Sequence, residues 1–280
     1  MEEKKVGELE QRYQKLESKK TLLMKLNETV PWSEFRPILE QVHDKPRKNN
    51  AGRKPIAPIV MFKMLGLQQL YNITDEELDY QLNDRLSFMR FLGLGLAQPV
   101  PDATTVCLFR QQLKQQSLIE ELFEQFDRDL RHQGYQAKGG KIVDATVIPV
   151  PKQDNTKEEK QKLAQGEIPE SWQEKPHRLS WKDTDASWTK NNGQSSFGYK
   201  KHISIDVKYG FLRRYQVTHA SVHDSQVLGA LLDDQNQGEE VWANSAYRSE
   251  SIECILQILQ FLSHIHEQAN RNHPLTAKQK

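Results

Sequence analysis

Cysteine is scarce in this sequence: Cys107 and Cys254 are the only two, and neither has a partner in a Cys-x-x-Cys spacing. This scarcity excludes a disulfide framework, argues against a thiolate zinc site and is typical of a reducing compartment. Long apolar runs are also missing, because no segment approaches the roughly 20 apolar residues that cross a bilayer. The charged N-terminus lacks the apolar centre of a signal peptide. We therefore expect a soluble, cytoplasmic protein with no membrane partner.

A net charge is lacking too, since 39 Lys and Arg residues face 38 Asp and Glu residues and leave a formal charge of +1. The overall charge therefore does not indicate a nucleic acid partner. Its distribution is less even, because basic residues outnumber acids between residues 43 and 54 and again between residues 175 and 214. Such stretches fit a polyanion bound at particular faces, and a solvated surface explains any one of them equally well.

The chain does contain enough apolar material, 36% of 280 residues, for one sizeable core and a smaller module. Its first part, residues 1–54, combines a polar helix with a basic linker. Apolar residues of the helix follow the 3-4 spacing of a coiled-coil seam, which Lys20 interrupts. A short self-associating helix and an ordinary amphipathic helix both satisfy this pattern. The seam consists of Val6, Leu9, Tyr13, Leu16, Leu23 and Leu26.

The pattern of residues 55–132 predicts a compact helical module. An apolar helix ends near Asn72, and a capping box that begins at Thr74 opens a second helix reaching Leu92. Asp102 caps a third helix. Three short helices of this kind resemble a helix-turn-helix module whose last helix enters a major groove, with a plain helical bundle as the alternative. The polar positions of the third helix carry Thr104, Thr105, Arg110, Gln111 and Lys114.

Residues 138–280 have the texture of a mixed α/β domain. A short run rich in β-branched residues, 141–150, predicts a buried strand, and a polar insert follows at about 152–196. Helices that begin near Asp224 and Ser249 alternate with the later strands, which together predict a mixed α/β sheet. The further strands are expected at residues 202–207, 211–217, 240–243 and 263–266.

Two polar residues stand where this sheet could carry chemistry. Asp144 lies in the middle of an apolar strand, where a carboxylate usually needs a metal or a cation as partner. The alternatives are a structural salt bridge and exposure at the end of the strand. Asn244 follows the strand at 240–243, at the strand exit where open α/β sheets place ligand groups. Asn244 could also simply make the turn by bonding its own backbone.

Other polar clusters are weaker candidates. The segment 219–224 resembles a metal cluster superficially, but Asp224 at a helix start is better explained as an N-cap. His264 and His266 share one face of a strand without a third ligand nearby. The tryptophans of the insert, among them Trp172, could stack on unpaired bases or complete a core.

In combination these residues resemble the insertion-sequence-five family of transposases, members of the DDE group with an RNase H-like catalytic domain. The resemblance covers nearly the whole chain and rests on several motifs in a fixed order. The most specific segments are residues 52–55, continuing to 70–71, then 83–88, 91–93, 100–105, 143–146, 198–200, 223–225 and 242–248.

In that family three carboxylates hold two divalent ions, normally Mg²⁺, which activate water and then a DNA 3′-hydroxyl for displacement at phosphorus. The resemblance places Asp144 at the first acid and Asn244 at the second, where the family has Asp. The third acid, a Glu beyond an arginine-rich segment, has no counterpart before Lys280, and neither Glu253 nor Glu267 stands in the matching segment. The resemblance therefore implies a C-terminally truncated copy with a weakened Mg²⁺ (or Mn²⁺) site and impaired catalysis.

The resemblance also implies double-stranded DNA as partner, namely the terminal inverted repeats of a bacterial insertion sequence and its target DNA. It implies a homo-oligomer on that DNA, associated with the nucleoid. Two alternatives to an active transposase are a non-catalytic DNA-binding protein that represses intact copies, and a different nuclease on the same fold. The residues expected to contact DNA are Arg53, Lys54, Thr104, Thr105, Arg110, Lys114, Lys200, Lys201 and Arg248.

Overall fold

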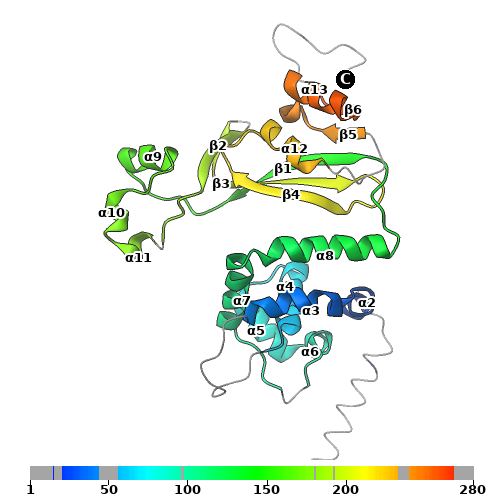
Figure 1. Ribbon diagram of the computed structural model, residues 1–280. Helices are drawn as coiled ribbons and strands as arrows, with labels where there is room; N and C mark the ends of the chain where they lie inside the picture. The colour runs from blue at the N-terminus through cyan, green and yellow to red at the C-terminus, as the bar shows by residue number, and fades with distance from the viewer. Residues whose placement is uncertain are drawn as a thin grey trace, which may run out of the picture. The chain divides into compact units, whose positions relative to one another are not determined.

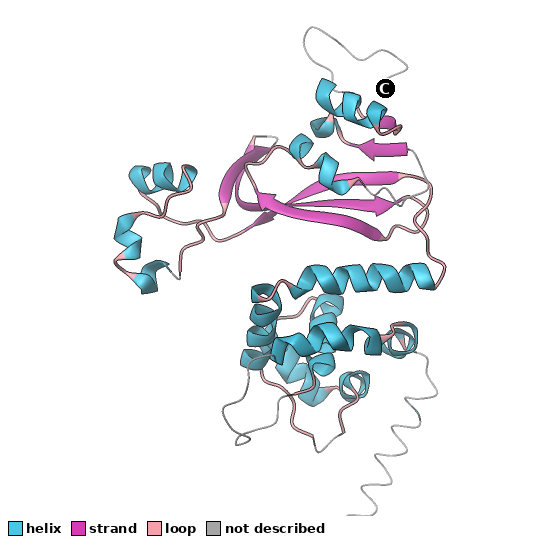
Figure 2. Ribbon diagram, in the orientation of Figure 1, coloured by secondary structure: helices cyan, strands magenta, loops and turns pink. Residues whose placement is uncertain are grey.

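The computed structural model describes residue 15 and residues 21–43, 56–95, 98–179, 181–191, 193–232 and 240–267. The chain divides into two compact units, residues 1–134 and residues 135–280. The described part of the first unit is helical (Figure 1), and the second unit is built on a β-sheet, as the colours of Figure 2 show. The predicted α+β architecture is therefore confirmed. None of the described helices is long and apolar enough to span a bilayer.

The helical unit consists of consecutive helices that pack around a shared interior. Several α-helices are joined by 3-10 turns or by a single residue. In chain order the described elements are α2 (Leu22–Thr29), η1 (Trp32–Phe35), α3 (Arg36–Glu40), η2 (Gln41–His43), α4 (Pro58–Tyr71), α5 (Asp75–Asp84), α6 (Leu86–Leu92), α7 (Ala103–Gln115) and α8 (Leu118–His132).

One apolar core stabilises the helical unit. Leu67 and Leu78 are completely buried in it, and each such side chain contributes about 1.5–3 kcal/mol relative to an exposed one. Leu23 and Phe35 belong to the same core. The described residues 21–43, which the sequence assigned to a separate N-terminal part, therefore pack together with the helical module.

The predicted capping residues are found at the helix starts of this unit, but the Glu77 side chain accepts from Gln81 instead of completing the predicted capping box. The Thr74 side chain accepts a hydrogen bond from the Glu77 backbone N–H at 3.2 Å, and Asp102 accepts one from the Thr105 N–H at 2.7 Å. Each bond satisfies a backbone donor that has no partner within the helix. Asn72 ends α4 in the left-handed conformation, with φ 50°, which Asn tolerates better than most residues. The boundaries at these three positions were predicted correctly.

The predicted second helix is in fact two helices. Arg85 adopts an extended conformation, with φ −103° and ψ 107°, and separates α5 from α6. The break lets Leu82 of α5 and Phe88 of α6 enter the same core, which a straight helix would not achieve. Residues 93–102 then connect α6 to α7, a longer connection than the short turn of a helix-turn-helix motif.

The second unit contains a sheet with helices and an insert. The insert is formed by the short helices between β1 and β2. In chain order the described elements of the second unit are β1 (Lys141–Pro149), α9 (Lys157–Ala164), α10 (Glu170–Gln173), α11 (Pro176–Leu179), β2 (Ser187–Asn191), β3 (Gln194–Asp206), β4 (Leu212–His219), η3 (Asp224–Gln226), α12 (Leu228–Leu231), β5 (Glu240–Ala243), η4 (Ser245–Tyr247), α13 (Glu250–Ile258) and β6 (Leu262–Ile265).

The sheet is mixed, as predicted, with β1 at its centre. The strand order is β2-β3-β1-β5-β6, and β4 pairs with β3 beside β2. Strand β1 runs antiparallel to β3 and parallel to β5, and β5 runs parallel to β6. The long strand β3 pairs with β2 through its first residues and with β4 through its later ones. The edge strand predicted at 263–266 is confirmed as β6.

Two predictions about the strands were wrong in detail. Strand β3 begins at Gln194, inside the predicted polar insert, because its early residues pair with β2 in a hairpin that hydrophobic pattern alone does not reveal. Strand β1 is not buried on both faces, since its residues alternate between buried and exposed from Lys141 to Asp144. One face of the strand therefore packs on a core and the other carries exposed side chains.

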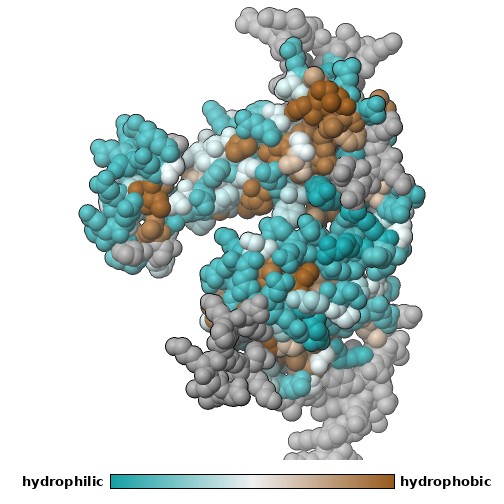
Figure 3. All heavy atoms as spheres, viewed as in Figure 1, coloured by the Kyte–Doolittle hydropathy of each residue, from teal (hydrophilic) through white to brown (hydrophobic). Residues whose placement is uncertain are grey.

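The buried face of the sheet packs against α12, η4 and α13. Val143, Val241 and Ala243 contribute to this core from the strands, and Leu231 and Leu256 from the helices. On the outer side of α13 apolar side chains stay exposed and form the brown patch in the upper part of Figure 3. The exposed apolar residues of this region are Ile255, Ile258, Leu259 and Leu262.

Candidate active site

The structure brings Asp144 and Asn244 together, although they lie 100 positions apart in the sequence. The parallel pairing of β1 with β5 sets Val143 beside Ala243. The residues that follow these two in the chain, Asp144 and Asn244, therefore lie side by side. The Asn244 side-chain amide donates a hydrogen bond to Asp144 Oδ1 at 3.3 Å. Strand register therefore assembles the two residues singled out as the candidate site.

Asp144 is exposed, which fits the alternative of exposure and not that of a carboxylate buried among apolar neighbours. It lies on the exposed face of β1, where its Oδ1 also accepts the backbone N–H of Ala145 at 2.8 Å. The exposed carboxylate stays hydrated, so it avoids the free-energy cost of burial and needs no buried partner. Asp144 is instead available to a ligand that arrives from solvent.

Asn244 makes the turn and faces Asp144 at the same time. It is the N-cap of η4, and its Oδ1 accepts the backbone N–H of Ala246 at 3.0 Å. This bond uses one lone pair of the amide oxygen and leaves the NH₂ group pointing at Asp144. An amide N–H is a donor and cannot ligate a cation, so in this arrangement the group that faces Asp144 supplies neither charge nor a metal ligand.

A neutral phenol lies beside the pair. Tyr247, at the end of η4, is completely buried, and its hydroxyl has no hydrogen-bond partner among the residues that the structure describes. Burial, reinforced by the negative charges of Asp224 and Asp144, raises the pKa of Tyr247 well above its ordinary value. The group therefore stays protonated and adds no negative charge to the site.

Asp224 is an ion-pair partner and not an N-cap, which corrects the sequence interpretation. The Lys200 ammonium donates to Asp224 Oδ1 and to the Val222 carbonyl, each at 2.8 Å. The cap of η3 is His223, whose ring nitrogen accepts the Ser225 N–H. Because both members of the pair are mostly buried, Lys200 acts as a clamp between β3 and the segment before η3.

A neutral histidine, His202, lies on β3 opposite the residue that follows Asp144 in β1. His202 pairs with Ala145 across β1 and β3, is completely buried and shares a hydrogen bond of 3.0 Å with the Thr218 hydroxyl. Burial lowers the pKa of His202; Asp224 opposes this effect and Lys200 adds to it. The imidazole is therefore held neutral within the unit.

Lys201 and Arg248, both predicted to contact DNA, differ in how free they are. Lys201 is exposed and pairs with Thr146 in the register of β1, which places it on the same sheet face as Asp144. Arg248 donates to the Ile265 carbonyl at 2.9 Å and lies 3.3 Å from Glu267 and 3.9 Å from Glu253. Its guanidinium therefore also ties the end of η4 to α13 and β6.

The predicted contacts of the helical unit also divide into free and engaged side chains. Thr104 and Lys114 are exposed on α7. Arg110 instead forms a two-pronged contact with Asp75, with distances of 2.6 and 3.2 Å, and donates to Gln68 at 2.8 Å. The Thr105 hydroxyl donates to the capping Asp102. The predicted contacts Arg53 and Lys54 lie outside the described residues.

The described residues supply only some of the oxygen ligands that a divalent metal ion would need at this site. Carboxylate and amide oxygens are hard donors of the kind that Mg²⁺ prefers. Asp144 offers a carboxylate, but the amide oxygen of Asn244 is engaged, and no group of three or more His, Cys, Asp or Glu side chains in the described ranges is placed to hold an ion.

The structure thus places two exposed polar side chains side by side where two parallel strands meet, which is a usual position for a ligand site in a sheet of this kind. Comparison with known families supplies the class of protein. A family model described as a transposase domain (DUF772) matches residues 10–112, and one described as a transposase DDE domain matches residues 135–280. The chain belongs to the family of transposases with a DDE domain. No solved structure matches it.

Proposed function

We propose that this chain is a transposase of the insertion-sequence-five family that binds the terminal inverted repeats of a bacterial insertion sequence and is impaired in DNA cleavage and strand transfer. The observation that carries the proposal is the Asn244 amide, which donates to Asp144 where the family has a second carboxylate. The family membership supplies the reaction class, and this hydrogen bond supplies the impairment.

The reaction needs negative charge at this position. Two divalent ions about 3.5–4 Å apart stabilise the attacking and leaving oxygens of the phosphodiester, and they require carboxylates between them. An Asp at position 244 would keep the cap on Ala246 with one oxygen and offer the other to an ion. With Asn244 the site loses one unit of charge, so Mg²⁺ or Mn²⁺ binds weakly and the second ion is hardest to hold.

Exposed polar side chains of both units support DNA binding. Lys201 lies on the face of Asp144, and Thr104 and Lys114 lie on α7. We assign phosphate contacts to the lysines, together with Arg53 and Lys54. Neutralised phosphates release counterions, so the affinity for DNA falls steeply as salt rises.

A second candidate function follows from the same hydrogen bond. A protein that still grips the element ends without cutting them represses transposition, by occupying the ends or by joining intact copies in mixed oligomers on the DNA. This repressor needs the DNA contacts but no metal site, and it acts at the nucleoid of the bacterial cytoplasm.

The test combines binding, cleavage and metal affinity. The purified chain is mixed with a labelled duplex that carries the inverted repeats flanking its coding sequence, with Mg²⁺ or Mn²⁺. We expect salt-sensitive gel shifts and no more strand cleavage than in the matched variant Asp144→Asn. Efficient cleavage that Asp144→Asn abolishes would overturn the impairment, and the absence of any gel shift would overturn the DNA-binding function.

Calorimetric titration with Mn²⁺ isolates the charge at position 244. Asp144 and Asn244 are both exposed, so water screens their charges and leaves an attraction of about 1 kcal/mol for each pair of unit charges at about 4 Å. Because Mn²⁺ carries two charges, the variant Asn244→Asp should bind it about tenfold or more tightly. The control Asn244→Ala keeps the site uncharged and should show no gain. Equal Mn²⁺ affinities for Asn244→Asp and the wild-type chain would contradict the proposed cause.

A further inference from the structure

Three exposed polar side chains stand in one row across β1, β5 and β6, namely Asp144, Asn244 and His266. The parallel pairing of β5 with β6 sets Ala243 beside Ile265. The His266 backbone N–H continues this ladder, because it donates to the Ala243 carbonyl at 3.0 Å. His266 therefore lies beside Asn244 on one side, as Asp144 does on the other.

Side chains of neighbouring strands meet on this face of the sheet, both between β1 and β5 and between β5 and β6. Between β1 and β5 the Asn244 amide donates to Asp144 Oδ1 at 3.3 Å. Between β5 and β6 the rings of Trp242 and His264, which are partners in the strand register, stack with their centroids 5.0 Å apart and 11° between their planes. Successive side chains of a strand alternate between its faces, so His266 shares the face of His264, and Asn244 shares that of Trp242. The imidazole of His266 and the carboxylate of Asp144 therefore flank Asn244 on one exposed face.

The two flanking groups are close enough to share one ion. Neighbouring strands lie about 4.8 Å apart, so the backbones of Asp144 and His266 are about 10 Å apart. A ligand atom lies about 2.0–2.2 Å from a bound Zn²⁺ ion, and a carboxylate and an imidazole that lean toward each other above Asn244 span the remaining distance. Within the described part of the chain no group hydrogen-bonds the His266 ring, so its nitrogen is available as a ligand.

The chemistry of this pair favours a transition metal over magnesium. Mg²⁺ requires oxygen ligands in near-ideal octahedral geometry and gives up its water reluctantly. An imidazole nitrogen suits Zn²⁺, Ni²⁺ and Cu²⁺ instead, and histidine is the commonest protein ligand of such ions. The row lacks a second carboxylate at Asn244, but it gains a nitrogen ligand one strand further on.

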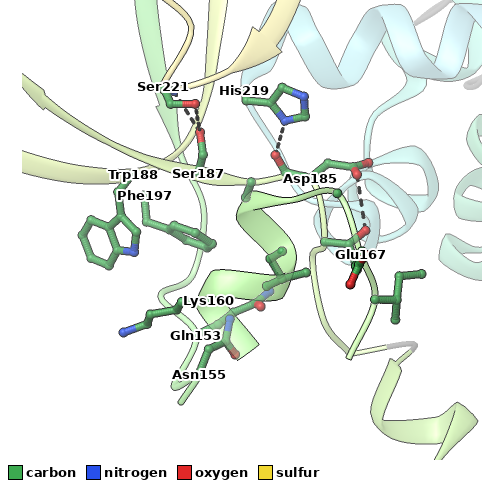
Figure 4. A pocket seen from close by; sticks show the side chains of 15 residues that line it. Gln153, Asn155, Lys160, Glu167, Asp185, Ser187, Trp188, Phe197, His219 and Ser221 are labelled. Carbon is green, nitrogen blue, oxygen red and sulfur yellow. Dashed lines mark hydrogen bonds between the residues drawn. The ribbon is translucent and has the colours of Figure 1, made fainter. Parts of the chain in front are cut away.

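Another histidine that lies near acidic groups, His219, is engaged by the protein itself. It lines a pocket of about 590 Å³ between the insert and the sheet, which Figure 4 shows from close by. A ring nitrogen of His219 is hydrogen-bonded to the Asp185 backbone carbonyl, and the hydroxyls of Ser187 and Ser221 bond each other at 3.1 Å. His266 is therefore the better placed of the two histidines to bind a metal ion.

We propose that His266 is a metal ligand and that Asp144 and His266 together bind one transition-metal ion, such as Zn²⁺, in preference to Mg²⁺. Water fills the remaining coordination positions, as it does at zinc sites that keep an open position. The inference rests on the proposed function, which makes Asp144 the metal-binding residue, and it names the kind of ion that the altered site accepts.

The experiment measures binding of Zn²⁺ and, separately, of Mg²⁺ to the full chain by isothermal titration calorimetry near neutral pH. The wild-type chain should bind Zn²⁺ more tightly than Mg²⁺. His266→Asn should weaken Zn²⁺ binding by at least about tenfold, since even the outer partners of a metal ligand are worth about 10–100-fold in affinity. Its Mg²⁺ affinity should hardly change, because oxygen atoms hold that ion. Asp144→Asn should weaken the binding of both ions.

Two control variants separate this site from other groups that bind Zn²⁺. His264→Asn removes the imidazole that stacks on Trp242, and Cys254→Ser removes an exposed thiol of α13. Both variants should bind Zn²⁺ as tightly as the wild-type chain. Circular dichroism of each variant verifies that it is folded, which is expected because the substituted side chains are exposed.

Each outcome has a definite meaning. If Zn²⁺ binds no more tightly than Mg²⁺, or if His266→Asn leaves the Zn²⁺ affinity unchanged, the assignment of His266 fails. If His264→Asn weakens Zn²⁺ binding as much as His266→Asn does and Asp144→Asn has no effect, the two histidines hold the ion at the sheet edge and the shared site is excluded. The gel shifts that test DNA binding need no metal ion, so the proposed function and the role of His266 can fail separately.

Discussion

The two units bury different kinds of side chain. In the helical unit the interior is apolar, and the buried polar residues among those described are Gln68 and Asp129. The sheet unit buries a larger set of charged and polar groups, which each need a hydrogen-bond partner to avoid a penalty of about 1–3 kcal/mol. The helical unit therefore depends mainly on apolar packing, and the sheet unit combines an apolar core with a set of buried polar side chains. The buried polar residues of the sheet and its insert are Lys141, Glu159, His202, Ser204, Asp206 and Arg213.

The prediction with the largest expected effect tests whether the two units unfold independently of each other. Leu67→Ala removes a completely buried side chain from the helical core and should lower the free energy of unfolding of that unit by about 2–5 kcal/mol. Urea unfolding is followed by circular dichroism and by tryptophan fluorescence in a Trp32→Phe background, which restricts the fluorescence to the sheet unit. The circular dichroism transition should move and the fluorescence transition should not.

Leu231→Ala is the matched control for this experiment, because Leu231 is just as buried in the core of the sheet unit. It should move the fluorescence transition instead. If each variant shifts both transitions equally, the two units unfold as one cooperative body and the contrast between them does not extend to stability.

The second effect concerns the close approach of two strands in the sheet unit. Gly198 has φ +152°, and a Cβ there would lie 2.1 Å from the Ile148 carbonyl oxygen. Gly198→Ala should therefore push β3 away from β1 and cost about 3 kcal/mol of stability, measured by thermal unfolding. The control Gly229→Ala adds a Cβ in open space within α12 and should be neutral or slightly stabilising. A similar loss for both variants would show that strand spacing is not the cause.

The smallest effect is a pH dependence specific to the sheet unit. Because burial lowers the pKa of His202 in the folded state, the unfolded chain binds more protons once the pH falls below the ordinary value of about 6.5. The free energy of unfolding that neutral His202 contributes is therefore complete above about pH 7.5. It is lost as the pH falls through about 6.5, the ordinary pKa of histidine. Calorimetry from pH 8 to 5.5 should show a decrease in Tm of a few degrees that His202→Gln removes. A pH dependence unchanged in the variant would assign it to another group.

The elements themselves were largely predictable because their signals are local. The caps at Thr74 and Asp102 and the strand at 240–243 depend on neighbours in sequence. The break at Arg85 and the early start of β3 were missed, since each depends on packing or pairing with a distant segment.

The site was predictable in its members but not in its details. Asp144 and Asn244 could be named from their strand positions, and their contact follows from parallel pairing. The roles of Lys200, Arg110 and Arg248 could not be read from the sequence, because an ion pair depends on which acid the fold brings near. Charge in the sequence therefore overestimates the number of cations that are free to meet DNA.

The separation of 100 positions between Asp144 and Asn244 has a consequence for the newly made chain. At about 5–20 residues per second, a ribosome needs about 5–20 s to travel from one codon to the other. During that interval β1 can already pair with β3, but its other edge waits for β5. The contact between Asp144 and Asn244 therefore forms only after β5 has been synthesised, later than the pairing of β1 with β3.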